Sequence, residues 1–283
     1  MVSLEDYGNF ETAWCPGCGN FSILQCLKEA LVGLGLSPHE VLLVSGIGQA
    51  AKAPHYLRAN VFNGLHGRSL PVATGAKLAN SQLTVIAESG DGDNYGEGGN
   101  HFLAAIRRNI NITLLVHNNQ IYGLTKGQAS PTTAEGQITK AQPGGVRSTP
   151  FNPLAVAVAL QAGFVARGFS GNPKHLTALI QKAVTHPGFA LVDILQPCVS
   201  FNKVNTYRWY QERCYELPDD YQPDLWEEAM KTAMIWGETI PTGVIYQKEK
   251  PTFESHFSIL NRGTLIDQSP DPNQFQKILE GYF

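Results

Sequence analysis

The stretch QLTVIAESGDGDNYGEGGNHFLAAIRRNINITLLVHNN, residues 82–119, decides the fold class. It opens with a short β-rich run that ends in glycine, residues 82–90, and closes with a second such run, residues 110–119. Between the two runs, residues 99–109 place apolar side chains at helical spacing. A strand, a helix of about ten residues and another strand are the repeating unit of a parallel sheet.

The same rhythm continues on both sides of this stretch. Further helices are expected at residues 21–36, 69–81, 152–163 and 173–186, and further strands at residues 40–46, 164–170 and 188–198. We therefore predict an α/β fold with a doubly wound, mostly parallel sheet in a first domain, residues 1–200. The rhythm stops after Cys198, and residues 201–283 are richer in aromatic and charged side chains. We predict that they form an irregular C-terminal extension that wraps the sheet or a partner.

Composition excludes several classes of protein. The chain has 283 residues, 43% of them hydrophobic and 16% charged, as in an ordinary globular protein. A net charge of −3 is too small to recruit nucleic acid or an anionic membrane, and no apolar run reaches the length of a spanning helix. The first ten residues lack the features of a secretory signal, and five cysteines do not form a disulfide framework. We expect a reduced, cytoplasmic protein.

The residues that follow the strands carry the chemistry, because ligands of open α/β sheets bind at the carboxyl ends of the strands. These loops are SGIGQ (45–49), SGDGDNYGEGGNH (89–101), HNNQIYGLTKGQ (117–128) and QPCVSFN (196–202). Three of the four are rich in glycine, aspartate and asparagine. Such loops suit phosphate groups and a divalent cation.

The glycine-rich loop at residues 89–101 fits neither of two common motifs. A dinucleotide fingerprint would need glycine at Tyr95, and a calcium-binding EF-hand loop would need glutamate at Phe102. Asp91 and Asn119 remain, and they follow strands that we expect to be neighbours. Their oxygens suit Mg²⁺ holding a diphosphate, although both residues could instead be turn residues that cap helices.

At this point the sequence resembles a known family. Gly-Asp-Gly followed at this distance by Asn-Asn resembles the thiamine diphosphate motif. The wider set WCPGCG, SGIG, LHGRSLPVATGAKLAN, GDGDNYGEGGNHFLAAIRRN, NQIYGLTKGQASPT and QPCVSFN resembles the β subunit of 2-oxoacid:ferredoxin oxidoreductases. The resemblance is dense over residues 12–131 and continues to about residue 205. It implies a thiamine diphosphate-binding fold.

The resemblance also implies roles for particular residues. Magnesium ligands would be Asp91, Asn119 and the main-chain oxygen of Ile121. Diphosphate contacts would come from Gly92, Asp93, Gly123 and Leu124, with Ile47, Gly48 and His66 near the cofactor. His66 is the candidate catalytic residue, although a histidine in such a loop could simply be a hydrogen-bonding residue.

Two cysteines, Cys15 and Cys18, are spaced as Cys-x-x-Cys in the segment TAWCPGCGN. Fourteen preceding residues are too few for the strand and helix of a thioredoxin site, and no pair with zinc-finger spacing follows. In the family that the chain resembles, these cysteines and Cys198 match three of the four thiolates of a 4Fe–4S cluster. The remaining thiolate is expected directly after SGIG, where this chain has Gln49.

Gln49 leaves the cluster open to several interpretations. A cluster could take an oxygen, a water or a distant thiol as its fourth ligand, it could contain three irons, or it could be absent. Cys26 and Cys214 are the other thiols. Cys26 falls on the apolar face of the first helix, where a buried role is more usual, and Cys214 lies in the C-terminal extension.

The function implied by the resemblance is oxidative decarboxylation of a 2-oxoacid, 2-oxoglutarate or pyruvate, with coenzyme A. The products would be acyl-CoA and CO₂, with electrons passed to ferredoxin, and the reverse reaction would fix CO₂. The family places the glutamate that acts on the cofactor's pyrimidine ring on an α subunit. The chain is therefore expected to work as αβ or (αβ)₂. A thiamine diphosphate-dependent non-oxidative decarboxylase or carboligase without a cluster is the alternative.

Overall fold

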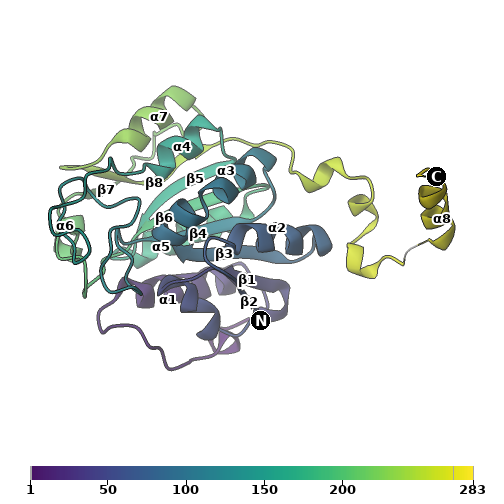
Figure 1. Ribbon diagram of the computed structural model, residues 1–283, viewed down its shortest axis with the longest axis horizontal. Helices are drawn as coiled ribbons and strands as arrows, with labels where there is room; N and C mark the ends of the chain where they lie inside the picture. Colours follow the sequence, from purple (N-terminus) through teal and green to yellow (C-terminus); the bar gives the residue numbers. More distant parts are fainter. Residues whose placement is uncertain (1, 270, 283) are drawn as a thin grey trace.

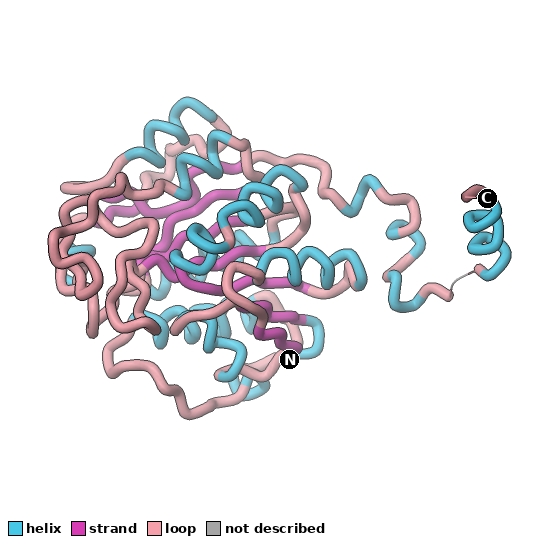
Figure 2. The backbone as a smooth tube through the Cα atoms, viewed as in Figure 1, coloured by secondary structure: helices cyan, strands magenta, loops and turns pink. Residues whose placement is uncertain are grey.

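A computed structural model describes residues 2–269 and 271–282, and it contains a twisted eight-stranded sheet with helices on both faces (Figure 1, Figure 2). The order of the strands across the sheet is β2-β1-β3-β4-β6-β5-β8-β7. Their bounds are β1 Val41–Ser45, β2 Asn60–Asn63, β3 Thr84–Gly90, β4 Thr113–Asn118, β5 Phe164–Phe169, β6 Ala190–Leu195, β7 Cys214–Glu216 and β8 Ile240–Gln247. The first six strands are parallel, and β8 pairs antiparallel with β5.

The α-helices alternate with the strands through most of the chain. Their bounds are α1 Gly19–Gly33, α2 Ser69–Ala79, α3 Gly99–Arg108, α4 Pro153–Ala159, α5 Pro173–Thr185, α6 Tyr207–Gln211, α7 Trp226–Met234 and α8 Pro272–Glu280. A π-helical turn, Gly92–Glu97, precedes α3. Every helix and strand expected within residues 1–200 is present, and the prediction of a doubly wound, mostly parallel sheet is confirmed.

Both faces of the sheet are buried, which explains the continuous apolar runs of its strands. Leu43 and Leu115 pack with α1 and α5 on one face, and their neighbours Val44 and Leu114 pack with α2, α3, α4 and α7 on the other. Successive strand residues point to opposite faces, so a strand covered on both sides has no polar alternation. This two-sided core fixes the positions of the loops at the carboxyl edge.

Three elements of the sheet were not predicted. Strand β2, NVFN, has only four residues, all exposed, and is too short to show an apolar period. Strand β8, IPTGVIYQ, contains Pro241 and Gly243, which disfavour strands and mask its pattern. The short strand β7 pairs with β8, so residues beyond 200 extend the sheet at one edge.

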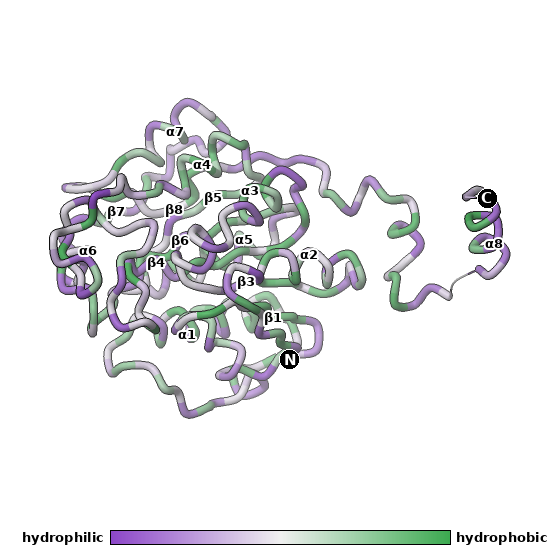
Figure 3. Tube along the Cα trace, in the orientation of Figure 1, coloured by the Kyte–Doolittle hydropathy of each residue, from purple (hydrophilic) through white to green (hydrophobic). Residues whose placement is uncertain are grey.

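After Phe253 and Glu254, which still contact the body of the protein, the chain continues as an arm (Figure 1). Short helical turns lead to α8, which lies far from the sheet (yellow in Figure 1). No residue of α8 is buried, and Phe275 and Ile278 expose about three-fifths of their surface, 61% and 60%. Figure 3 shows that α8 and the arm leading to it alternate between hydrophobic and hydrophilic segments. Among residues 2–269 and 271–282, no helix combines the length and apolar character needed to cross a membrane.

Candidate functional site

A cavity of about 110 Å³ opens at the carboxyl ends of β1, β3 and β4, which are neighbours in the sheet. All the residues predicted to bind Mg²⁺ and thiamine diphosphate line it, namely Ile47, Gly48, His66, Asp91, Gly92, Asp93, Asn119, Ile121, Gly123 and Leu124. The register places Gly90 of β3 opposite His117 of β4, so Asp91 and Asn119 follow adjacent strand ends. Four separate loops therefore converge on one space.

Asp91 is a buried carboxylate that accepts two side-chain hydrogen bonds on the same oxygen. Its Oδ2 accepts hydrogen bonds from Ser130 Oγ at 2.6 Å and Thr132 Oγ1 at 2.5 Å. No ion pair compensates its charge among the described residues. Burial raises the pKa of Asp91 to about 6, although the two hydroxyls act in the opposite direction. A cation bound beside Asp91 would compensate this buried negative charge.

Asn119 and Ile121 form a compact turn beside this carboxylate. Asn119 Oδ1 accepts a hydrogen bond from the Ile121 amide at 3.0 Å, and Asn119 Nδ2 donates to Gln196 Oε1 at 2.9 Å. The intervening Gln120 has a positive φ of 58°, which turns the chain sharply after β4. Gln196 follows β6 and fixes the orientation of the Asn119 amide.

The side chain of Asp93 is hydrogen-bonded to neighbouring loops of the protein. Its Oδ1 accepts hydrogen bonds from the amides of Ile47 at 3.0 Å and Gly67 at 2.8 Å, and it lies 2.7 Å from His66 Nδ1. Ser89 Oγ donates to Oδ2 at 2.7 Å. The carboxylate thus ties three loops together, and only the main chain of Asp93 is left to contact a diphosphate.

Two glycines are required by these contacts. A Cβ at Gly46 would collide with Asp93 Oδ2, and a Cβ at Gly92 would collide with the Tyr122 ring. Tyr122 Oη in turn donates to Glu97, at 3.1 Å from Oε2. The glycines of the motif therefore allow the loops to pack closely, besides giving phosphate access to the backbone.

The three predicted cluster cysteines come together in a second pocket next to the first. Cys15, Cys18 and Cys198 line it, and they come from the N-terminal loop and the segment after β6. Ser200 Oγ donates to Cys15 Sγ at 3.0 Å, and Gln196 Nε2 donates to Cys18 Sγ at 3.5 Å. Burial, together with the neighbouring thiols, raises the pKa of Cys18 to about 11.

Gln49 lines both pockets and so stands between the cysteines and the diphosphate cavity. Its main-chain oxygen accepts a 2.7 Å hydrogen bond from Trp14 Nε1, which fixes the backbone. Its side-chain Oε1 is buried without a hydrogen-bond partner. An oxygen therefore occupies the place where the resemblance expects a thiolate.

The remaining thiols do not reach this pocket. Cys26 is buried in the core under α1, and Cys214 lies on β7 at the opposite edge of the sheet. Among the described residues, no three cysteine, histidine or acidic side chains are placed to share one metal ion. Thiolates of a 4Fe–4S cluster each bind a different iron, so they lie farther apart than ligands of one ion.

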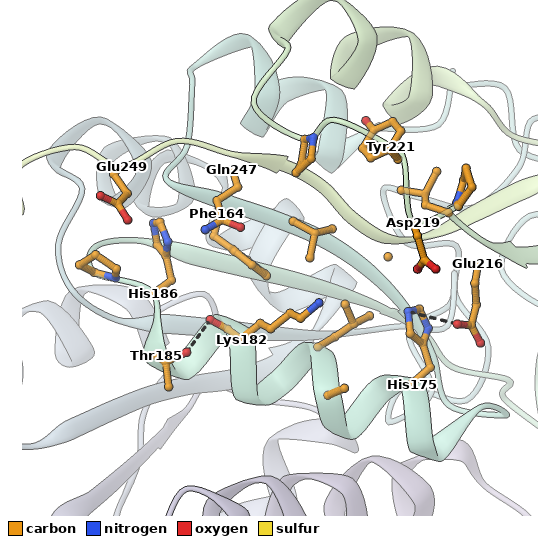
Figure 4. Close-up of a pocket in the computed structure, with 18 residues that line it drawn as sticks. Phe164, His175, Lys182, Thr185, His186, Glu216, Asp219, Tyr221, Gln247 and Glu249 are labelled. Carbon is orange, nitrogen blue, oxygen red and sulfur yellow. Dashed lines mark hydrogen bonds and ion pairs between the residues drawn. The ribbon is translucent and has the colours of Figure 1, made fainter.

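A larger cavity, about 620 Å³, lies elsewhere, between α5 and the segment that joins β7 to β8 (Figure 4). None of the predicted site residues line it. Its charged side chains have both signs, with Lys182 facing Asp219 and His175 lying 3.9 Å from Glu216. Size alone therefore does not locate the chemistry of this chain.

Sequence reasoning missed the residues that support the site. Ser130 and Thr132 lie within the motif NQIYGLTKGQASPT, but nothing in that loop indicated that their hydroxyls contact Asp91. Gln196 and Ser89 were likewise without a role. One signal in the sequence could have indicated them. A buried carboxylate needs hydrogen-bond donors nearby, and residues 130–133 include three hydroxyl side chains.

Comparisons with known proteins agree with this geometry. Residues 44–194 match the family model "Thiamine pyrophosphate enzyme, C-terminal TPP binding domain", and residues 198–262 match the model for the C-terminal part of the pyruvate ferredoxin oxidoreductase beta chain. The β subunit of 2-oxoacid:ferredoxin oxidoreductase from Saccharolobus solfataricus is 45% identical over 249 residues, covering 83% of this chain and 82% of that protein. A 2-oxoglutarate oxidoreductase subunit, KorB, from Mycobacterium tuberculosis is 46% identical over 192 residues, covering 68% and 52%.

A solved structure is also similar over nearly the whole chain. It is 2-oxoglutarate:ferredoxin oxidoreductase from Magnetococcus marinus with 2-oxoglutarate, coenzyme A and succinyl-CoA bound. The TM-score is 0.92 at 35% identity, covering 98% of this chain and 96% of that one.

Proposed function

Because the chain belongs to the family of β subunits of 2-oxoacid:ferredoxin oxidoreductases, we propose that it carries the diphosphate half of the active site. The reaction would be oxidative decarboxylation of a 2-oxoacid, 2-oxoglutarate or pyruvate, with coenzyme A, or its reverse. The observation that carries this proposal is the single cavity that gathers every predicted cofactor-binding residue, directly beside three cysteines.

The residues present fit Mg²⁺ and a diphosphate. Asp91 has an uncompensated buried charge, and Asn119 and the Ile121 main chain lie on the same rim. We infer that these three would hold the metal, while the backbone of Gly92 and Gly123 would approach the diphosphate. When bound, thiamine diphosphate supplies the carbon nucleophile and electron sink for loss of CO₂. His66, held through Nδ1, keeps Nε2 available to hold or transfer a proton at the cavity.

The cavity is too small for the whole cofactor, which supports a second polypeptide. Sites for drug-sized ligands enclose roughly 300–1,000 Å³, whereas this one has about 110 Å³. We propose that the site is completed in an αβ or (αβ)₂ enzyme, where the pyrimidine-binding part comes from an α subunit. The exposed apolar side chains of α8 support this proposal, because exposed hydrophobic clusters mark interaction surfaces.

We also propose that Cys15, Cys18 and Cys198 bind an iron–sulfur cluster that passes single electrons to ferredoxin. Their convergence beside the cofactor cavity supports it, and Gln49 in the fourth place favours either an oxygen ligand or a three-iron cluster. The five cysteines are all free thiols, which supports a reducing, cytoplasmic location.

The test is to reconstitute this chain with an α subunit and to purify the complex anaerobically. The complex should reduce ferredoxin when given a 2-oxoacid, coenzyme A, Mg²⁺ and thiamine diphosphate, and the β chain alone should not. Iron analysis of the same sample tests the cluster separately. Turnover by the isolated chain would overturn the two-subunit proposal. A complex that releases CO₂ without reducing any acceptor would overturn the oxidoreductase proposal.

A further inference from the structure

A third cavity, of about 270 Å³, lies on the α4 and α7 side of the sheet, separate from the cofactor and cysteine pockets. Its walls are largely apolar and include Phe151, Leu154, Met234 and Trp236. Its polar end is formed by Arg167 of β5 and Asp193 of β6. Nothing in the proposed function uses this cavity.

Arg167 is the unusual feature of the cavity, because the residue is almost completely buried, at 3% exposure. Nη1 donates to the main-chain oxygens of Ile235 and Pro241 at 3.4 and 3.3 Å, while Nε is buried without any partner. The edge that carries Nε and Nη2 is the one with which arginine binds a carboxylate side-on. A buried guanidinium with an unpaired donor is costly unless something binds it.

The nearby Asp193 does not fill this place. No ion pair within 4.0 Å joins it to Arg167 in the part of the chain that the structure describes. Its Oδ1 accepts from Tyr95 Oη at 2.7 Å, and Asn118 Nδ2 lies 3.2 and 3.1 Å from its two oxygens. Asp193 is therefore committed to these neighbours. Trp236, 5.5 Å from the guanidinium carbon, covers Arg167 with its ring.

From this arrangement we propose that the cavity is a binding site for a small monocarboxylate with an aromatic or branched apolar body. The carboxylate would pair with Arg167, and the body would lie against Phe151, Leu154 and Trp236. Water would find few partners along such walls, whereas an apolar group buries them favourably. A cavity of about 150 Å³ holds benzene, so about 270 Å³ has room for a ring and a short acidic arm.

The cavity also touches the proposed metal site. Thr132, one of its lining residues, has its hydroxyl 2.5 Å from Asp91 Oδ2 and 3.0 Å from Asn118 Oδ1. A hydroxyl has one proton, so it can donate to only one of these two oxygens. A carboxylate bound at Arg167 would therefore change the affinity of the proposed metal site for the cofactor, because Asn118 and Thr132 connect the two sites. This linkage rests on the proposed function, whereas binding at Arg167 does not.

The experiment is calorimetry on the full-length chain with phenylacetate and its neutral analogue phenylacetamide. We expect one saturable site per chain, with phenylacetamide weaker by about tenfold or more. Arg167→Gln should abolish binding, and Ala134→Phe, which adds a ring at another residue of the cavity wall, should do the same without altering Arg167. Arg213→Gln is the matched control, because Arg213 also lies over a tryptophan ring but outside the cavity.

Three results would overturn the site. They are the absence of saturable binding to the wild-type chain, equal affinity for the acid and the amide, and unchanged affinity in a folded Arg167→Gln or Ala134→Phe protein. If Arg167→Gln does not fold, Ala134→Phe decides. Thiamine diphosphate affinity measured with and without saturating phenylacetate tests the linkage. An unchanged value overturns the linkage and leaves the site standing.

Discussion

His66 Nδ1 lies 2.7 Å from Asp93 Oδ1, and this contact holds the one histidine of the cofactor cavity in a fixed orientation. The carboxylate is buried, whereas 40% of the His66 side chain is exposed toward the cavity. A carboxylate on Nδ1 favours the tautomer with its proton there, which leaves Nε2 as the free nitrogen. The same arrangement of acid and histidine orients bases in many enzymes.

Asp93→Asn should therefore lower kcat more than it affects KM. Asparagine keeps one acceptor oxygen but carries no charge, so the hydrogen bond that fixes His66 through Nδ1 is weakened. We expect a decrease in kcat of about 10–100-fold, measured on the reconstituted complex at saturating cofactor. Ser89→Ala is the matched control, because it removes the hydroxyl on Oδ2 and leaves the His66 contact intact. Equal losses in the two variants would show that the carboxylate is only structural.

Asp91→Asn should abolish Mg²⁺-dependent binding of thiamine diphosphate while the fold remains intact. The variant keeps the size of the side chain and its neighbours Ser130 and Thr132, but removes the charge that a cation would need. Calorimetric titration of the cofactor in the presence of Mg²⁺ measures the loss. Undiminished affinity in this variant would contradict the assignment of Asp91 as a ligand.

The same variant gives a pH signature in the absence of metal. Burial raises the pKa of Asp91 from 3.8 to about 6, so the folded chain binds this proton more tightly than the unfolded chain. The stabilisation of the folded chain by this proton is fully present below pH 3.8 and is lost as the pH rises through 6. Relative to Asp91→Asn, the wild-type chain should lose about 2–3 kcal/mol of unfolding free energy over this range.

Denaturant titrations of both proteins at several pH values measure that difference. Mg²⁺ with thiamine diphosphate should restore stability to the wild-type chain only. Parallel pH curves for the two proteins would mean that the Asp91 charge is already compensated within the chain.

The C-terminal arm gives a prediction about assembly. Ile278→Glu should weaken association with the α subunit by tenfold or more. A charge at an apolar position that becomes buried on association costs about 2 kcal/mol of binding free energy. The melting temperature of the chain itself should not change, since no residue of α8 is buried. Gln276→Glu adds the same charge to the same helix away from the apolar positions. Identical affinities for the two variants, measured by analytical ultracentrifugation, would remove α8 from the interface.

The sheet and the meeting of Asp91 with Asn119 could be predicted because both follow from strand direction. Parallel strands carry their carboxyl ends to one edge, and the period of the apolar residues identified each strand. The supporting residues could not be predicted in this way. Thr132 lies 41 positions from Asp91 in a loop without periodicity, and only the folded chain brings them together. Likewise, no pattern revealed that the Asp93 carboxylate accepts hydrogen bonds from the Ile47 and Gly67 amides.

The region beyond residue 200 was the hardest to predict for a related reason. Strand β8 is antiparallel to β5 and lies between β5 and the edge strand β7, with Pro241 and Gly243 inside it. Its position depends on pairing with a strand more than seventy residues earlier, and local propensity opposes it. Tertiary pairing overrode propensity there, as it commonly does in strands.

The cysteine pocket gives the sharpest prediction for a single residue. Gln49 stands where a thiolate is expected, its backbone is fixed by Trp14, and its Oε1 has no partner. A cysteine at this position would start from the same backbone and face the same three thiols. Gln49→Cys should therefore raise the iron content of the anaerobically purified complex toward four per β chain.

The physical reason lies in charge and ligand softness. A fourth thiolate adds one negative charge and one soft ligand, and both lower the potential and retain iron more firmly. Wild-type protein should then show substoichiometric iron, or an electron paramagnetic resonance signal that converts readily to the three-iron form. Cys214→Ser is the control, because Cys214 does not line the pocket and its loss should leave iron unchanged. Four firmly held irons in the wild-type complex, unaltered by Gln49→Cys, would mean that another group completes the cluster. No iron in either protein would mean that these cysteines hold none, and the electrons of the reaction would need another exit.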